Sequence, residues 1–262
     1  MPPTNRPHSP RIVIYHQTHF KANGDFASLL PLVTESPDTL GVTHIIIAAL
    51  HVNAQAGDIT LNDDPPNAPR NEQLWEELAI FQDMGVKVLG MLGGAAKGTF
   101  QRLDGSDYEF GLYYPPLRNV IRRYAFNGLD LDVEEPMSLG GIIRLIDYLK
   151  ADFGDSFLVT FAPVAFALQG MDHLSGFDYE ALEVMRGHQV AWYNTQFYNN
   201  WGCLQSFADY DAILSRGWKP EKIVVGVLTN PGLGHGYVDY AELQRTVAAL
   251  SQFYPGFGGI MG

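Results

Sequence analysis

Short runs of apolar and β-branched residues recur along the chain, separated by longer stretches in which apolar residues return every three or four positions. Runs of the first kind are typical of buried strands in a parallel sheet, and stretches of the second kind are typical of amphipathic helices. We predict eight strands, at residues 11–15, 44–49, 86–91, 128–133, 157–163, 190–197, 222–228 and 257–261.

Helical stretches lie between most of these strands. One of them, 139–152, follows the capping residue Ser138 and ends before Gly154. Because strands that alternate with helices form parallel sheets, and because about eight repeats favour closure, we predict an α/β fold. The expected form is a single-domain (β/α)8 TIM barrel over residues 11–262, with an open doubly wound sheet as the alternative. Helices are predicted at 71–84, 139–152, 179–186, 207–215 and 240–253.

Within the segment 127–134, apolar and acidic side chains alternate strictly from Leu129 to Glu134. Side chains of a strand point alternately to its two faces, so Asp130, Asp132 and Glu134 share one face. In a barrel the leucines between them would face the surrounding helices, and the three carboxylates would point inward. Neighbouring carboxylates on one strand face, roughly 6.5 to 7 Å apart, repel one another, so at least one of their pKa values should rise.

A raised carboxyl pKa suits a general acid near neutral pH. We expect Glu134, which lies nearest the open end of the barrel, to be the proton donor. Asp132 would orient the reacting group, and Asp130 would be its buried partner. The alternation is also compatible with an acidic edge strand that faces solvent, or with a divalent-metal site. Three histidines from neighbouring segments could contribute to such a metal site: His16, His19 and His51.

Composition narrows the choice of partners. The chain of 262 residues carries 17 basic and 29 acidic side chains, and its formal charge of -12 repels phosphate backbones and anionic membranes. We therefore expect no nucleic-acid or membrane partner, and we expect a monomer. The one cysteine, Cys203, cannot form an intrachain disulfide, and no Asn-x-Ser/Thr sequon occurs. The sequence therefore does not decide between a cytoplasmic protein and one that is secreted after processing. Residues 1–10 hold four prolines and no apolar run, which predicts a disordered lead-in.

Four segments on four predicted strands resemble, in the same order, the signatures of glycoside hydrolase family 18. The acidic run is similar to the family motif that ends in the catalytic glutamate, and the resemblance extends over nearly the whole chain from Arg11 onward. Two longer runs, 89–96 and 192–198, look most like those of fungal endo-β-N-acetylglucosaminidases, which cut N-glycans within their chitobiose core. The four segments are residues 91–94, 127–134, 160–163 and 196–199.

The resemblance implies a retaining mechanism without cofactor or metal, in which the substrate's own 2-acetamido oxygen attacks the anomeric carbon. It implies that Glu134 protonates the leaving oxygen and that Asp132, backed by Asp130, holds the acetamido N–H. Tyr198 would donate a hydrogen bond to the acetamido oxygen. Trp201 is expected either as a stacking platform for a sugar ring or as a loop-packing residue. The substrate-binding residues are predicted to be Tyr15, Gly93, Gly94, Gln196, Asn199 and Trp201.

Three functions agree with this resemblance. The first is an endo-β-N-acetylglucosaminidase that hydrolyses the GlcNAc-β-1,4-GlcNAc core of N-glycans, with an N-glycan or a glycoprotein as its partner. A chitinase is the second, and a non-catalytic chitinase-like lectin is the third, disfavoured because such lectins commonly lack the donor glutamate that is present here as Glu134. In the family a tryptophan and a last helix follow the eighth strand, whereas this sequence stops at Gly262, so a barrel truncated at its eighth unit is an expected alternative.

Overall fold

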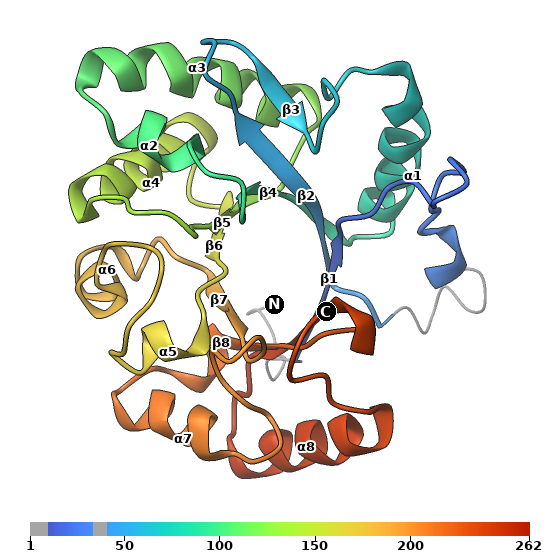
Figure 1. Cartoon of the computed structure of the whole chain (residues 1–262), viewed down its shortest axis with the longest axis vertical. Coiled ribbons are helices and arrows are strands. Elements are labelled where there is room, and N and C mark those ends of the chain that lie inside the picture. The colour runs from blue at the N-terminus through green and yellow to red at the C-terminus, as the bar shows by residue number, and fades with distance from the viewer. Residues whose placement is uncertain (1–9, 34–40) are drawn as a thin grey trace, which may run out of the picture.

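The computed structural model describes residues 10–33 and 41–262, and within them eight parallel strands close into a barrel (Figure 1). Hydrogen-bonded neighbours follow the order β1-β9-β8-β7-β6-β5-β4-β2, and a pairing between β1 and β2 completes the ring. The predicted TIM barrel is therefore confirmed. Its strands are β1 (Arg11–His16), β2 (His44–Val52), β4 (Lys87–Gly93), β5 (Gly128–Asp132), β6 (Leu158–Phe161), β7 (Trp192–Gln196), β8 (Ile223–Gly226) and β9 (Gly259–Met261).

Helices surround the barrel on its outside (Figure 1). The predicted bounds of α6 and α8 agree with the observed ones. Short 3₁₀ turns lie at Leu30–Leu32, Pro69–Asn71, Pro220–Lys222 and Pro231–Leu233. The α-helices are α1 (Glu72–Asp83), α2 (Thr99–Asp104), α3 (Asp107–Arg123), α4 (Leu139–Phe153), α5 (Ala165–Leu168), α6 (Tyr179–Arg186), α7 (Ala208–Ser215) and α8 (Tyr240–Phe253).

Two apolar cores result from the alternation of side chains along the strands. The larger one fills the space between strands and helices and includes Leu129 and Leu131 of β5, both fully buried. The smaller one fills the barrel interior and includes Met91, Trp192 and Met261. The leucines of β5 thus belong to the larger, outer core, as the alternation predicts. The aspartates between them face the barrel interior.

The structure differs from the sequence prediction in two connecting segments. The segment 51–70, which lies between a predicted strand and a predicted helix, contains a hairpin: β2 continues to Val52, and β3 (Ile59–Leu61) pairs with it in antiparallel fashion. The helices α2 and α3 follow the third barrel strand, where the sequence pattern did not predict them. The eighth predicted strand, at 257–261, is present as β9 and pairs with both β1 and β8, so it closes the barrel.

Two other expectations concern the ends and surfaces of the chain. The disordered lead-in predicted at 1–10 falls almost entirely on residues 1–9, which lie outside the described residues. In the described part of the chain, no helix has both the length and the apolar character needed to cross a bilayer.

Candidate active site

The acidic residues of β5 and of the segment that follows it line the carboxyl-terminal end of the barrel interior. Asp130 is 0% exposed and Asp132 is 8% exposed, whereas Glu134 is half-buried at the rim. The strand ladder ends at Asp132, so Glu134 stands just beyond the sheet. The carboxyl ends of barrel strands are where this fold builds its reaction sites. The inward row predicted from the alternation is therefore present.

Three donors from three other strands surround the carboxylate of Asp130. The hydroxyl of Tyr15 donates to Oδ2 at 2.7 Å, the hydroxyl of Thr160 donates to Oδ1 at 2.5 Å, and the amide of Asn194 donates to Oδ1 at 3.0 Å. Trp192 Nε1 in turn donates to Asn194 Oδ1 at 2.8 Å and fixes that amide. Burial raises the pKa of Asp130, while the three hydrogen bonds act against the rise because they favour its charged form.

Asp132 has fewer compensating partners. Burial, followed by the charges of Glu134 and Asp130, raises its pKa well above the usual range; Lys97 and a hydrogen bond from Gln196 act in the opposite direction. Gln196 Nε2 donates to Asp132 Oδ1 at 3.3 Å and to the carbonyl oxygen of Ala162 at 2.8 Å. Asp132 therefore tends to hold a proton between two other carboxyl groups.

Tyr198 lies in the segment that follows β7 and faces the row of carboxyl groups formed by Asp130, Asp132 and Glu134. Burial and the charges of Asp132, Glu134 and Asp130 raise the pKa of its hydroxyl far above the usual value. The hydroxyl is therefore protonated at any physiological pH and available as a hydrogen-bond donor. Its predicted hydrogen bond to the acetamido oxygen of a substrate stays a prediction.

Gly93 and Gly94 bring the loop after β4 against the end of β5. Both have left-handed backbone conformations, with φ of 98° and 88°. A Cβ atom on Gly93 would lie 2.6 Å from the carbonyl oxygen of Asp132 and 2.3 Å from the ring of Phe100. The N–H of Gly94 donates to the same carbonyl oxygen at 2.9 Å. The glycines thus permit a close approach of two main chains, while their predicted contact with substrate stays a prediction.

Four of the predicted substrate-binding side chains contact other parts of the protein. The hydroxyl of Tyr15 donates to Asp130, and the amide of Gln196 donates to Asp132, so both side chains support the carboxylates. Asn199 Oδ1 accepts a hydrogen bond from the main-chain N–H of His235 at 2.9 Å and so joins the loops after β7 and β8. Trp201 is half-buried, lies edge-on to Phe166 and packs against the outer core. The structure thus shows the packing role of Trp201, and its stacking on a sugar stays a prediction.

A polar hollow of about 760 Å³ lies at the carboxyl ends of β1 and β2. Its lining includes Ala96, which belongs to the same short loop as Gly94 and Lys97, but none of the three carboxylates and not Tyr198. Within residues 10–33 and 41–262, no group of three or more His, Cys, Asp or Glu side chains is arranged to hold a metal ion. The hollow is lined by Gln17, Thr18, His19, Phe20, His51, Asn53, Thr60, Leu61, Asn62, Asp63, Asp64, Arg70, Asn71 and Ala96.

Sequence reasoning did not assign a role to four residues at this site. Asn194 lies two positions before Gln196 on β7, so the period of two that places Gln196 inside the barrel also places Asn194 there. Thr160 occupies the position of β6 opposite Asp130. Lys97 and Glu135 contact main-chain groups, which leave no pattern in the sequence.

Comparison with known proteins agrees with this geometry. The family described as Glycosyl hydrolases family 18 matches residues 11–236. The structure of a chitinase from Aspergillus fumigatus is 52% identical, with a TM-score of 0.94, covering 97% of this chain and 91% of that one. The structure of a fungal endo-β-N-acetylglucosaminidase is 45% identical, with a TM-score of 0.92, covering 97% and 89%.

A curated relative, Chitinase 2 of Rhizopus oligosporus, is 26% identical over 277 residues, which cover 97% of this chain and 48% of the relative. The chain spans about half the length, or less, of the curated relatives it matches. The family match covers most of the chain, and the barrel and the acidic end of β5 agree with it. The chain therefore belongs to glycoside hydrolase family 18.

Proposed function

We propose that this protein hydrolyses the β-1,4 bond between two N-acetylglucosamine units and that chitin oligomers are its preferred substrate. The observation that carries the proposal is the buried row of Asp130, Asp132 and Glu134, faced by the hydroxyl of Tyr198, in a family 18 chain. The chitinase from Aspergillus fumigatus supports chitin over N-glycans because its identity to this chain is higher than that of the endo-β-N-acetylglucosaminidase. This ranking reverses the order expected from the sequence.

The proposed reaction uses the substrate's acetamido group as nucleophile. Glu134 gives its proton to the glycosidic oxygen while the C1–O bond breaks, and the electron pair of that bond stays with the leaving oxygen. The acetamido oxygen forms a bond to C1, and Asp132 takes a hydrogen bond from the acetamido N–H as positive charge develops. Tyr198 donates a hydrogen bond to the acetamido oxygen and so orients it. Water then attacks C1 while the bond between C1 and the acetamido oxygen breaks, which regenerates the acetamido group, and the water gives a proton to Glu134, which restores the enzyme.

An endo-β-N-acetylglucosaminidase is the second candidate, and the hollow at the carboxyl ends of β1 and β2 favours it. Its lining of amides, hydroxyls and charged groups suits the hydroxyl groups of a sugar branch, and its volume of about 760 Å³ leaves room for a substrate wider than a single linear chain. The similarity to a fungal enzyme of this kind supports the same choice. Both candidates cleave the same β-1,4 bond by the same reaction. They differ in the groups attached on either side of that bond, which are further N-acetylglucosamine units in chitin, and mannose and asparagine in an N-glycan.

The experiment is an incubation of the protein with chitin oligomers and, separately, with a high-mannose glycoprotein, followed by mass spectrometry of the products. Cleavage of the oligomers supports the chitinase. Release of a glycan that leaves one N-acetylglucosamine on asparagine, without cleavage of the oligomers, would replace it with the second candidate. No cleavage of either substrate would contradict the shared reaction.

The variant Glu134→Gln tests the proton donor. Because an amide cannot give up a proton to the leaving oxygen, we expect kcat to fall by at least about a hundredfold, while oligomer binding is retained. Turnover by mass spectrometry and affinity by calorimetry check the two parts. Glu76→Gln, at an exposed position of α1, is the matched control and should leave both unchanged. Undiminished turnover of Glu134→Gln would remove Glu134 from the donor role.

A further inference from the structure

Glu135, the neighbour of the proposed proton donor, is a buried carboxylate whose partners are main-chain groups. It is 2% exposed. Its Oε2 accepts a hydrogen bond from the N–H of Gly98 at 2.6 Å, and its Oε1 accepts one from the N–H of Phe100 at 2.7 Å. Both carboxylate oxygens are thus engaged by N–H groups at the start of α2. Hydrogen bonds to a charged carboxylate are short and about twice as strong as neutral ones.

The same loop contacts the main chain on the other side of the donor. Gly94 N–H donates to the carbonyl oxygen of Asp132 at 2.9 Å, and Lys97 Nζ donates to the carbonyl oxygen of Glu134 itself. With the bonds of Glu135, these contacts hold the main chain before, at and after Glu134. They are needed there because the ladder of β5 ends at Asp132, so no neighbouring strand fixes the peptide groups around Glu134.

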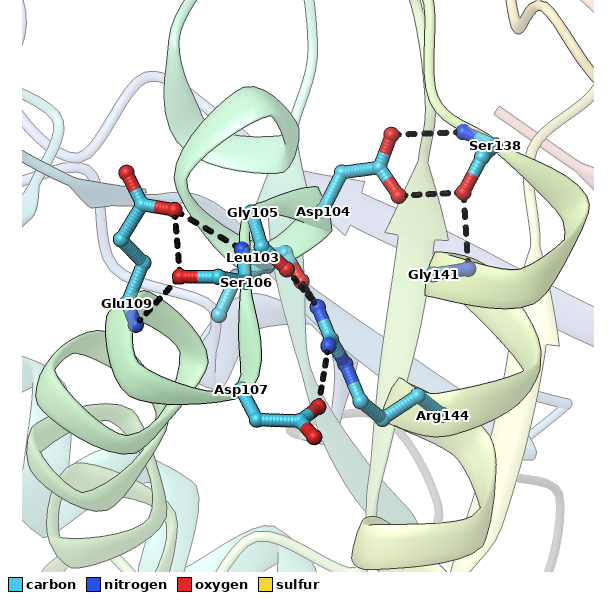
Figure 2. A network of polar contacts seen from close by, with 9 residues as sticks. All are labelled: Leu103, Asp104, Gly105, Ser106, Asp107, Glu109, Ser138, Gly141 and Arg144. Carbon is cyan, nitrogen blue, oxygen red and sulfur yellow. Dashed lines mark hydrogen bonds and ion pairs between the residues drawn. The ribbon is translucent and has the colours of Figure 1, made fainter.

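The helix that Glu135 binds is itself anchored at its other end. Asp104, the last residue of α2, accepts a hydrogen bond from the main-chain N–H of Ser138 at 2.8 Å and another from the hydroxyl of Ser138 (Figure 2). At its first turn, Thr99 Oγ1 accepts a hydrogen bond from the N–H of Val52 at 3.2 Å. The segment 135–138 therefore lies against α2 and is tied to it at both ends, and α2 is tied to the end of β2.

We propose that Glu135 is a positioning residue for the proton donor, so that its two bonds to the start of α2 fix the main chain from which Glu134 reaches the glycosidic oxygen. This rests on the proposed function of Glu134. A general acid acts only when its proton lies within hydrogen-bond reach of the leaving oxygen, and a displacement of about 1 Å costs a reaction roughly a hundredfold in rate. On the other side of this segment Ser175 contacts its flanks, because the Ser175 hydroxyl donates to the carbonyl oxygen of Val133 at 2.7 Å and the N–H of Met137 donates to the carbonyl oxygen of Ser175 at 3.0 Å.

This role predicts a dependence on the leaving group. A sugar is a poor leaving group, so it needs a proton from Glu134 to depart. A nitrophenolate departs readily without being protonated. Loss of the Glu135 anchor should therefore reduce kcat/KM strongly for a chitin oligomer and weakly for the nitrophenyl glycoside of the same oligomer. A residue that only stabilises the fold would affect both substrates equally.

The test compares Glu135→Gln with the wild type on these two substrates, below the unfolding transition of both proteins. An amide has one acceptor oxygen, and its NH₂ group would face a main-chain N–H, so one anchor becomes a repulsion. We expect kcat/KM for the oligomer to fall about tenfold or more and that for the nitrophenyl glycoside to fall less than about threefold. Glu135→Asp, which keeps the charge but shortens the arm, should regain most of the thermal stability and keep the selective loss.

Glu77→Gln is the matched control, because Glu77 is also a buried glutamate, 3% exposed, that accepts a main-chain N–H, from Leu29 at 2.8 Å. It should lower the melting temperature without selectivity between the substrates. Equal losses on both substrates in Glu135→Gln, or full oligomer activity in both Glu135 variants, would overturn the positioning role. If the wild type cleaves neither substrate, the proposed function fails instead, and the two failures remain distinguishable.

Discussion

Asp132 is buried between Asp130 and Glu134, and its ionisation in the folded state therefore costs free energy. Burial and the two neighbouring charges raise the pKa of this carboxyl group well above its usual value. For a group whose pKa is raised on folding, the contribution to stability is fully present below the unfolded pKa, near 3.8, and is lost as the pH rises through the folded pKa. The arrangement that suits the reaction thus weakens the fold at neutral and higher pH.

The variant Asp132→Asn should therefore be more stable than the wild type at pH 8. An amide carries no charge, and its oxygen can still accept the hydrogen bond from Gln196. We expect a gain of about 1 to 3 kcal/mol in the free energy of unfolding at pH 8, shrinking towards pH 4, with loss of activity. Urea denaturation at both pH values measures the change. Asp58→Asn, at an exposed position, should show no such trend, and a variant less stable than wild type at pH 8 would contradict the electrostatic account.

At the scale of single elements, the junction of α2, α3 and α4 holds the segment that carries the site. Ser138 caps α4, since its hydroxyl accepts the N–H of Gly141 at 2.9 Å, and it also binds Asp104 (Figure 2). Arg144 of α4 donates to the carbonyl oxygens of Leu103 and Gly105 and so joins the same corner. Gly141 leaves the space for this contact, because a Cβ atom there would lie 1.9 Å from Asp104 Oδ1.

Two neighbouring glycines of α4 should therefore respond in opposite directions to alanine. Gly141→Ala would displace Asp104 from Ser138 and should lower the free energy of unfolding by about 2 kcal/mol. Gly140→Ala meets nothing closer than Ser138 Oγ at 3.9 Å and should raise stability by about 0.5 kcal/mol, because alanine has the better helix propensity. Thermal melts of the two variants provide the comparison. Equal effects would mean that the Asp104–Ser138 contact contributes little.

The sequence was sufficient for the elements that carry a periodic pattern and insufficient for those that do not. The acidic alternation of β5 and the bounds of α6 and α8 follow from periods of 2 and 3.6 residues. Helix α3 was not predicted, and Pro115 and Pro116 lie inside it. The carbonyl groups that these prolines leave without a donor belong to Gly111 and Leu112, which are exposed, so water can satisfy them.

The positions of functional side chains were predictable only where the strand period fixes them. Asp130, Asp132 and Gln196 face the barrel interior as the alternation requires. The contacts of Glu135 could not be predicted, because its partners are main-chain N–H groups some 35 and 37 residues away, and any residue type supplies such a group.

At the scale of the whole molecule, one buried and one half-buried histidine make the stability of the fold depend on pH. His44 lies at the start of β2 and His16 at the end of β1, and burial lowers the pKa of each to about 4. For a group whose pKa is depressed on folding, stability is present above the unfolded value of 6.5 and is lost as the pH falls through the folded value. Each histidine can cost the fold up to about 3 kcal/mol over this range.

Replacement of His16 and His44 by glutamine should therefore flatten the loss of stability between pH 7 and pH 4.5. The expected result is a smaller change in the urea midpoint between these pH values than in the wild type; because the same carboxylates titrate in both proteins, their contribution cancels in the comparison. His188→Gln, at an exposed position, should keep the wild-type pH dependence. An unchanged slope in the double variant would show that neither imidazole governs the acid response.

The pairing of β9 with β1 also matters for the order of events during synthesis. The N–H of Tyr15 donates to the carbonyl oxygen of Gly262, and the hydroxyl of the same residue donates to Asp130. A nascent chain that has not yet emerged through Met261 cannot close the ring, and the edges of β1 and β8 then stay open to wrong partners. The main chain of Tyr15 is held by the residue that follows β9, and β9 comes last in chain order among the eight barrel strands, so the onset of catalysis would report the closure of the barrel.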